Sequence, residues 1–433
     1  MRSSVILPTL VLTWALAACS GGPATPTALP FAVTVFHAGT GTPPGGASAP
    51  PPATSAPAPA APVYGPDSFP ENVNPLTGQV SEAAKINRLP VAVKISNFPF
   101  AVRPQSGLSL ADVVFEHQAE EGLTRFTAIF LQNDAARIGS IRSARFIDTE
   151  IAPAFGALLV TSGSSIGTMA HLRANAYFSG DNVWRLVSEE THYACPPLCR
   201  AVPDDSNTLF ASTTDVRAAT AAHGSGQRAD LSGFQFTANA PAGGTPVDKV
   251  FVDFSQSAHV DWRYNIGSGR WQRWQDETLG GGFIAHFDSL TNQPLSAANV
   301  VVLYASHVNN YVPEDPADVT ICGLEIQLWT VGPARVFRDG KMYDGHWQRD
   351  AATKWKLKIK DEAGNPIPFK AGNTWFDIVG LNASSALGGS TFNVTNRVTD
   401  TRYGCPVQPT ATPTETPFGY VAPPETETPT PVQ

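Results

Sequence analysis

The spacing of apolar and polar positions divides the chain into four regions. Residues 5–18 form one apolar run, whereas residues 19–66 carry little charge and are dominated by Pro, Ala, Gly, Ser and Thr. Short apolar or alternating runs then recur over 67–405, and residues 406–433 return to a composition rich in Pro and Thr. Because a core needs regularly placed apolar side chains, the pattern predicts a folded region over 67–405 between a disordered linker and a disordered tail.

The first elements of the folded region are predicted to be strands. The segment "LPVAVKISN" (89–97) is a nearly continuous apolar run, which indicates a buried strand. In residues 111–132 apolar and polar residues alternate on both sides of Glu120-Glu121-Gly122. This alternation predicts a hairpin with a tight turn at Gly122.

Helices are predicted after this hairpin. Over 143–156 apolar residues recur near helical spacing, with Ser143 available as N-cap and Gly156 as the end. A short apolar strand is predicted at 157–163, followed by a second helix at 164–176 that begins with serine. Strand, small-residue loop and helix together form an α/β unit.

Beyond residue 233 the predicted elements are all strands and hairpins, separated by glycine-containing turns. They lie at 248–255, 260–274, 299–306, 325–350, 355–366 and 374–381. The predicted fold class is therefore α+β, with an N-terminal mixed α/β domain over 67–232. A smaller antiparallel β-rich domain is expected to follow over 233–405.

The N terminus carries a targeting pattern. Arg2 precedes the apolar run, which ends in Leu16-Ala17-Ala18-Cys19. These residues resemble the lipobox of bacterial lipoproteins, which implies removal of a signal peptide (1–18) and acylation of both the Cys19 thiol and the new N terminus. The chain would then be extracytoplasmic and lipid-anchored to the bacterial cell membrane. The alternative is an ordinary secretory signal with an incidental cysteine.

Charge and motif content exclude several classes of partner. The chain has 29 basic and 37 acidic residues, a formal net charge of −8. A nucleic-acid surface needs a basic face, so nucleic acid is not an expected partner. No glycine-rich phosphate loop followed by Lys-Ser/Thr is present, and no cofactor is predicted.

The cysteines suggest disulfides. With Cys19 lipidated, an even number remains, as expected of an exported chain with two disulfides. The four residues are Cys195, Cys199, Cys322 and Cys405. Of three possible pairings we favour Cys195–Cys199 across "CPPLC", which leaves Cys322 with Cys405. A metal site using His192 is the alternative, but structural zinc usually has tighter ligand pairs, and no metal is expected.

An arginine-rich stretch supplies the main candidate site. In "RIGSIRSARFID" (137–148), Arg142 and Arg145 would share a face if the helix began at Ser143, beside free amides where anions bind. Arginine binds carboxylate or phosphate through paired hydrogen bonds. Arg137 precedes the turn and is expected to be peripheral. The predicted ligand site comprises Arg103, Gln105, Glu116, Arg125, Arg142, Ser143, Arg145 and Ser164.

The same arginines could instead neutralise carboxylates inside the fold. A buried ion network fixes local geometry without binding any ligand. The available partners are Asp112, Glu116, Glu120, Glu121 and Asp148. The sequence leaves both interpretations open.

Catalytic interpretations are weaker. Glu116 and Glu120 have the same parity along a strand and could face one cleft, as in glycan-cleaving enzymes. The segment "TSGSS" (161–165) lacks the Gly-x-Ser-x-Gly pattern of a serine nucleophile. Tryptophans could form a sugar-binding platform or could be core residues. They are Trp262, Trp271, Trp274, Trp329, Trp347, Trp355 and Trp375.

Several linked motifs resemble the DUF3048 family of bacterial lipoproteins, whose function is unknown. They are "NPLTG" (74–78), "LPVAVKISN" (89–97), "RPQSGL" (103–108), "ADVVFEHQAEEGLTRF" (111–126), "IGSIRSAR" (138–145), "NVVVLYAS" (299–306), "GPARVFRDGKMYDGHW" (332–347) and "GNTWFDIV" (372–379). The resemblance covers residues 70–380 and implies an α/β part followed by a β-rich part. It brings no catalytic residue or substrate, and the CPPLC insert and the tail depart from it.

We therefore expect a membrane-anchored extracytoplasmic lipoprotein that binds an anionic cell-envelope ligand, with a peptidoglycan fragment as one candidate. The alternatives are a cell-wall glycan-cleaving enzyme that uses paired carboxylates and a non-catalytic envelope scaffold. We favour binding over catalysis because no catalytic set is complete. The oligomeric state does not follow from the sequence.

Overall fold

The computed structural model describes residues 62–191, 193–224, 226–315 and 318–396. The predicted signal peptide, Cys19, nearly all of the linker, Cys405 and the tail lie outside the described residues. Within the described ranges, no helix is both long and apolar enough to cross a membrane.

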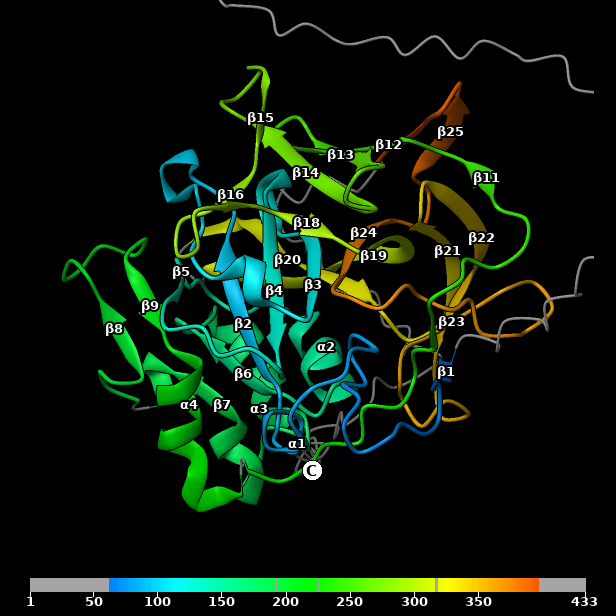
Figure 1. Cartoon of the computed structure of the whole chain (residues 1–433). Helices are drawn as coiled ribbons and strands as arrows, with labels where there is room; N and C mark the ends of the chain where they lie inside the picture. The colour runs from blue at the N-terminus through cyan, green and yellow to red at the C-terminus, as the bar shows by residue number, and fades with distance from the viewer. Residues whose placement is uncertain (1–61, 192, 225, 316–317, 397–433) are drawn as a thin grey trace, which may run out of the picture. The chain divides into compact units, whose positions relative to one another are not determined.

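A twelve-stranded sheet forms the centre of the fold (Figure 1). In spatial order its strands are β11 (Thr245–Pro246), β22 (Lys341–Arg349), β21 (Thr330–Arg338), β19 (Asn299–Asp315), β24 (Thr374–Gly380), β3 (Val113–Gln118), β4 (Thr124–Phe130), β2 (Val91–Ser96), β6 (Leu158–Thr161) and β7 (Leu186–Ser188), while β20 (Asp318–Gln327) pairs with β19 and β23 (Lys358–Lys360) with β22. Strands from both predicted domains pair directly, because β24 runs parallel to β3 with Trp375 opposite Val114. The sheet thus crosses residue 233, and the division at that residue stays a prediction.

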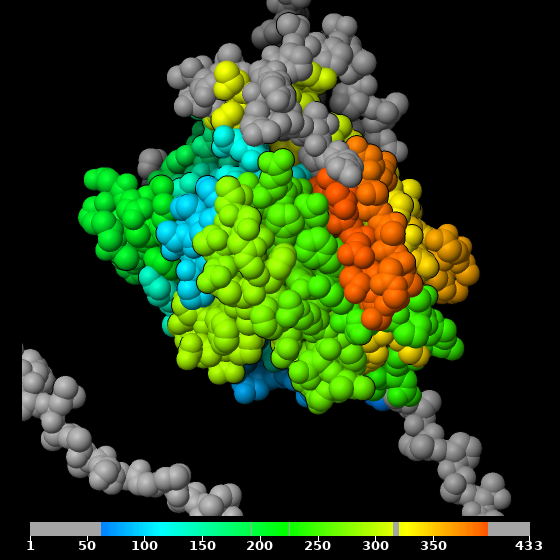
Figure 2. Space-filling model, turned by 90° about the horizontal axis from the view of Figure 1, so that it is seen from above, coloured from blue at the N-terminus to red at the C-terminus, as the bar shows by residue number. Residues whose placement is uncertain are grey.

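A second, seven-stranded sheet packs against one face of the first in a shared core cluster, and its residues form much of the surface seen in Figure 2. Its order is β15 (Phe283–Ala285), β14 (Arg270–Asp276), β13 (Ala258–Asn265), β12 (Lys249–Ser255), β26 (Thr391–Thr395) and β25 (Ser384–Gly388), with β18 (Ser296–Ala297) on β14. Side chains alternate along β12, so that Val250, Val252 and Phe254 are buried and their neighbours are half-buried. This sheet is mainly antiparallel, as predicted, but β12 and β26 run parallel.

Helices cover the opposite face of the large sheet. They are α1 (Ala83–Ile86), α2 (Asp148–Ala154) and α3 (Ile166–Ala174), while α4 (Thr213–Thr220) lies elsewhere. Ile151 of α2 and Leu172 of α3 pack with Phe115 and Phe376 in one core cluster. Because β24 has a core cluster on each face, all seven of its residues are buried.

A small three-stranded sheet lies at one side of the molecule (Figure 1). It consists of β5 (Ile138–Gly139), β9 (Leu209–Ala211) and β8 (Leu198–Arg200). Ile138, Leu209 and Val216 of α4 belong to the same core cluster as Val93 of β2. This packing fixes the small sheet on the large one.

The remaining short elements connect these layers. They are β1 (Val63–Tyr64) paired with β10 (Phe236–Thr237), β16 (Phe287–Asp288) paired with β17 (Gln293–Pro294), and 3-10 helices at Phe100–Val102, Leu108–Leu110, Glu120–Gly122, Gly180–Arg185, Glu189–Thr191 and Ala221–His223. Together with the sheets they make the described part of the chain mostly β, with helices in the first half.

The predicted strands at 89–97 and 157–163, the hairpin and the helix at 164–176 are confirmed. The predicted start of the first helix at Ser143 is wrong. That helix begins at Asp148, and its N-cap is Ile147 without a side-chain hydrogen bond. The amide of Arg142 donates to Lys94 O and that of Ala144 to Gly163 O, so this stretch bonds to neighbouring backbone instead of to a helix.

Candidate functional site

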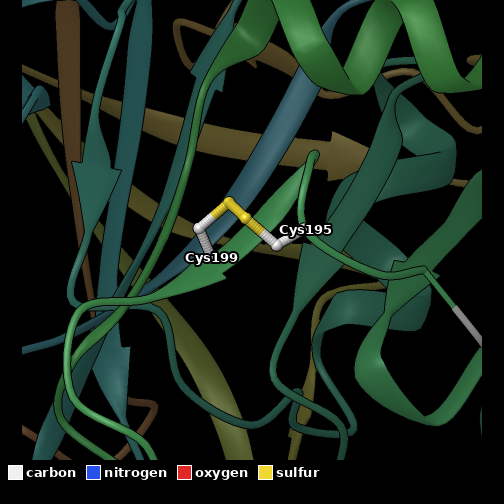
Figure 3. Close-up of a disulfide and its surroundings, with 2 residues drawn as sticks. All are labelled: Cys195 and Cys199. Carbon is white, nitrogen blue, oxygen red and sulfur yellow. A yellow bond between two sulfur atoms is a disulfide. The ribbon is translucent and has the colours of Figure 1, made fainter.

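The first disulfide prediction is confirmed. Cys195 and Cys199 are bonded across the turn that leads into β8 (Figure 3). Cys322 is buried in β20, whereas its predicted partner Cys405 lies outside the described residues. His192, which the metal alternative needs, is not described either.

Arg145 lies among carboxylates. Its Nε donates to Glu120, its Nη1 donates to Ala144 O at 2.9 Å, and its Nη2 lies 3.5 Å from a carboxylate oxygen of Glu314. Arg125 is close by and donates to Ser143 O at 2.5 Å. Burial, followed by repulsion from Arg145, lowers the pKa of Arg125 to about 9. The charge of Arg145 is therefore already compensated within the fold.

A second buried ion network lies beneath Arg145. Lys94 Nζ is 2.8 Å from Asp148 Oδ1 and 2.6 Å from His117 Nε2, and it donates to Thr127 Oγ1 at 2.9 Å. Burial lowers the pKa of Lys94 to about 8 and, with the adjacent lysine, lowers the pKa of His117 well below its usual value. The other oxygen of Asp148 accepts the amide of Arg145 at 2.7 Å. Asp148 thus links the two networks.

Glu116 faces the space between the two sheets. It accepts from Arg273 at 2.5 Å, from Asn97 and from Thr124. The expectation that Glu116 and Glu120 share one strand parity is wrong, because β3 ends at Gln118 and Glu120 belongs to the following 3-10 turn. The two carboxylates bind different arginines.

The remaining residues of the predicted ligand site lie in different parts of the fold. Gln105 is buried, donates to Ser96 O at 3.0 Å and bonds His286 at 2.6 Å. The amide of Ser164 donates to Glu190 at 3.1 Å. Arg142 Nη1 reaches Ser206 O at 3.3 Å, while its buried Nε has no partner among the described residues. These side chains do not converge on one cavity.

Most of the strand tryptophans are core residues. Trp262, Trp271, Trp347 and Trp375 are fully buried, and Trp329 is nearly so. Trp274 and Trp355 are half-buried. A continuous aromatic platform therefore does not form from this set.

A small polar cavity opens beside the small sheet. It has a volume of about 180 Å³ and is called the arginine pocket below. Its polar lining residues are Arg103, Ser106, Arg137, Ser140, Asn207 and Ser289. No carboxylate belongs to the lining. The pocket is large enough for ordered waters or for a small anion.

Two guanidinium groups give this pocket its charge. Arg103 donates from Nε to Asn97 O at 3.0 Å and from Nη1 to Asp276 O at 2.8 Å, which leaves Nη2 without a partner among the described residues. Burial, together with repulsion from Arg273, lowers the pKa of Arg103 to about 10, so it remains charged at neutral pH. Arg137 lies over the Phe210 ring at 3.4 Å and forms no ion pair with a described residue.

Two buried polar atoms of the pocket lack partners. Ser140 is only 3% exposed, yet its Oγ bonds nothing among the described residues, and neither does Asn207 Oδ1. Buried polar groups are normally hydrogen-bonded, so these atoms can be satisfied by a ligand or by water. Gly139 allows this geometry, because a Cβ on it would lie 2.7 Å from the Phe210 ring.

Sequence reasoning missed Arg137, Ser140 and Asn207. The first two lie in the stretch chosen from the sequence, but Arg137 was expected to be peripheral. Asn207 is distant along the chain and reaches the pocket because Gly139 of β5 pairs with Phe210 of β9. Two-residue strands of this kind show no usable periodicity.

Two family models match the chain. Residues 76–225 match the DUF3048 N-terminal domain, and residues 250–376 match the DUF3048 C-terminal domain, both described as belonging to a protein of unknown function. A similar protein is "Putative lipoprotein YerB" from Bacillus subtilis (strain 168). It is 28% identical over 331 residues, which are 74% of this chain and 90% of that protein.

A solved structure is also similar. The crystal structure of the YerB protein from Bacillus subtilis matches with a TM-score of 0.57 at 25% sequence identity. The match covers 71% of this chain and 96% of the solved chain. The likeness therefore extends through both halves of the described fold.

Proposed function

The chain belongs to the DUF3048 family, and from this we propose that it is an extracytoplasmic lipoprotein that binds an anionic cell-envelope ligand in the arginine pocket. The family carries no described activity, so the ligand class rests on the residues of the pocket. The anchor rests on the lipobox-like residues that end at Cys19, together with the name of the Bacillus relative.

One observation carries the ligand class. The arginine pocket has two guanidinium groups, an unpartnered buried hydroxyl and no carboxylate in its lining. Arg145, by contrast, is compensated by Glu120 and Glu314. A cavity lined by two guanidinium groups and an unpartnered hydroxyl favours an anion, because hydrogen bonds to ionised groups are the stronger ones.

Calorimetric titration of the full chain with inorganic phosphate tests whether the pocket binds an anion. A hydrogen bond to a charged group contributes about 1.5–3 kcal/mol, so Arg137→Ala should weaken phosphate binding by roughly 10- to 100-fold. The melting temperature should hardly change, because Arg137 is exposed. Arg173→Ala removes the same charge from another exposed position and is the matched control. Absence of phosphate binding, or an equal loss in both variants, would overturn the proposal.

The nature of the envelope ligand needs a second titration. Soluble peptidoglycan fragments that carry free carboxylates should compete with phosphate if they are the ligand. Failure to compete, with phosphate binding intact, would exclude them and keep the anion site.

Fractionation of cells tests the anchor. The full chain should be found in the membrane fraction and should incorporate labelled fatty acid, and Cys19→Ala should abolish the labelling. Equal labelling of the wild type and Cys19→Ala would exclude Cys19 as the lipidation site.

A further inference from the structure

A second, less polar cavity lies next to the arginine pocket. It has a volume of about 260 Å³ and is called the disulfide-side hollow below. Its lining includes Ala136, Pro197, Cys199, Ala201 and Ala211. Apolar groups dominate its surface, in contrast to the polar lining of the arginine pocket.

The two cavities share one wall. Arg137 and Phe210 line both of them, and the guanidinium of Arg137 lies over the Phe210 ring at 3.4 Å. The other charged groups of the hollow are Arg200, which is bound to Glu189 at 2.8 Å, and Asp215. An anion held by Arg137 in the arginine pocket therefore lies next to an apolar space on the other side of this wall.

The disulfide shapes the far side of the hollow. The bond between Cys195 and Cys199 closes the turn before β8 (Figure 3). Pro197 and Cys199 of this turn belong to the lining of the hollow.

We infer that the ligand is a phosphomonoester with an apolar substituent, the phosphate lying in the arginine pocket and the substituent in the disulfide-side hollow. This inference rests on the proposed function. A phosphate presents three terminal oxygens, enough for Arg103, Arg137 and the Ser140 hydroxyl, whereas a carboxylate presents two. The substituent is assigned to the hollow because Arg137 and Phe210 line both cavities, so the hollow is the apolar space next to the bound phosphate.

Methyl phosphate and butyl phosphate form the matched pair of probes. They carry the same charge at pH 8 and differ by three methylenes. Each methylene buried contributes about 0.8 kcal/mol, or roughly fourfold in affinity. Butyl phosphate should therefore bind the full chain at least roughly tenfold tighter than methyl phosphate. Butan-1-ol, which lacks the charge, should not bind measurably.

A variant in the hollow locates the effect. Ala201→Gln places a neutral polar side chain in the lining, so the butyl-to-methyl affinity ratio should fall towards one. Ala222→Gln makes the same change at an exposed position outside both cavities and should keep the wild-type ratio. The melting temperature of each variant shows whether it is folded.

The outcomes separate this inference from the proposed function. If inorganic phosphate does not bind, the proposed function fails. If inorganic phosphate binds but neither phosphomonoester does, the anion site stands and the phosphomonoester inference is wrong. If both bind equally, the anion site stands and the apolar extension is wrong. A butyl preference that survives Ala201→Gln in a folded protein overturns the assignment to the hollow. Binding of butan-1-ol at a strength similar to that of butyl phosphate overturns the role of the anion.

Discussion

Arg145 and Arg137 lie eight residues apart in one segment and have opposite surroundings. Arg145 is buried and bonded to Glu120 and Glu314, whereas Arg137 is exposed, covers Phe210 and has no carboxylate partner among the described residues. The first arginine is part of the fold, and the second is available to a ligand. Arginine density in a sequence therefore does not locate a binding site unless the carboxylates opposite each arginine are known.

Burial explains why the two arginines behave differently. A buried guanidinium loses its hydration and must be compensated by opposite charge, while an exposed guanidinium keeps its water. The two carboxylates that compensate Arg145 leave it little net charge for a further anion. An exposed arginine above a cavity is not under that constraint.

The largest expected effect comes from breaking the closed network. Arg145→Met leaves the Glu120 and Glu314 carboxylates buried without their cation. Removal of one partner from a buried ion pair typically costs about 3–5 kcal/mol of unfolding free energy. Urea unfolding measures this change. Phosphate affinity of the protein that remains folded should stay close to the wild-type value.

The double variant with Glu120→Gln is the control for Arg145→Met. Replacing both charges avoids an uncompensated carboxylate at position 120, so the double variant should lose less stability than Arg145→Met alone. A single variant as stable as the wild type would show that Arg145 is not a member of a closed network.

The second test addresses Arg103, which is largely buried, as Arg145 is, but lines the arginine pocket, as Arg137 does. Arg103→Met removes hydrogen bonds to the carbonyl oxygens of Asn97 and Asp276. We expect a loss of about 1–3 kcal/mol in unfolding free energy, together with a weakening of phosphate binding of at least roughly tenfold. Arg103→Lys keeps the charge but not the fork and should recover only part of the affinity. Unchanged phosphate affinity in Arg103→Met would remove Arg103 from the pocket.

The sequence predicted the regular parts of the fold. Strand β2 and the β3–β4 hairpin follow from continuous or alternating apolar runs, and α3 from a serine before a periodic segment. Ser165 indeed accepts the amide of Thr168 at the start of α3. These elements could be predicted because hydrogen bonds and burial within a short segment determine them.

The sequence did not predict contacts between distant segments. The start of α2 was missed because the amides of Arg142 and Ala144 bond to backbone far along the chain. The parallel pairing of β24 with β3 joins the two halves of the chain, and no local pattern encodes it. The arginine pocket depends on such contacts, since Arg103, Ser140 and Asn207 come from three separate segments.

The third test asks whether the pocket depends on a titrating neighbour. His259 lies 3.0 Å from Asp276 and 3.3 Å from Asp253, and hydrogen bonds to Asp253 and Asp276 raise the pKa of His259 to about 9. A raised folded-state pKa stabilises the protein below the unfolded value of about 6.5, and this contribution is lost as the pH rises to about 9.

His259→Gln should therefore be less stable than the wild type at pH 6, and the difference should disappear above about pH 9. Thermal unfolding of both proteins across this range measures it. Arg103 bonds the backbone carbonyl of Asp276 and not its carboxylate, so sulfate affinity should not follow the titration of His259. A sulfate affinity that falls in parallel with stability would make the pocket part of the titrating network.

The smallest expected effect distinguishes two serines of the arginine pocket. Ser140 Oγ has no partner among the described residues, whereas Ser106 Oγ donates to Arg137 O at 2.8 Å. An unsatisfied buried hydroxyl opposes folding, so Ser140→Ala should leave the unfolding free energy unchanged or raise it by up to about 1 kcal/mol. Ser106→Ala should lower it by about 1 kcal/mol, because a hydrogen bond is lost.

If the Ser140 hydroxyl bonds a ligand, Ser140→Ala should change ligand affinity and protein stability in opposite directions. Ser140→Ala should weaken phosphate binding several-fold while the protein becomes no less stable. Such a trade-off is expected of a group held ready for a ligand, because its cost in the free protein is recovered only on binding. A clear loss of stability in Ser140→Ala would mean that the hydroxyl is already bonded in the free protein. The pocket would then be closed in the way that the surroundings of Arg145 are.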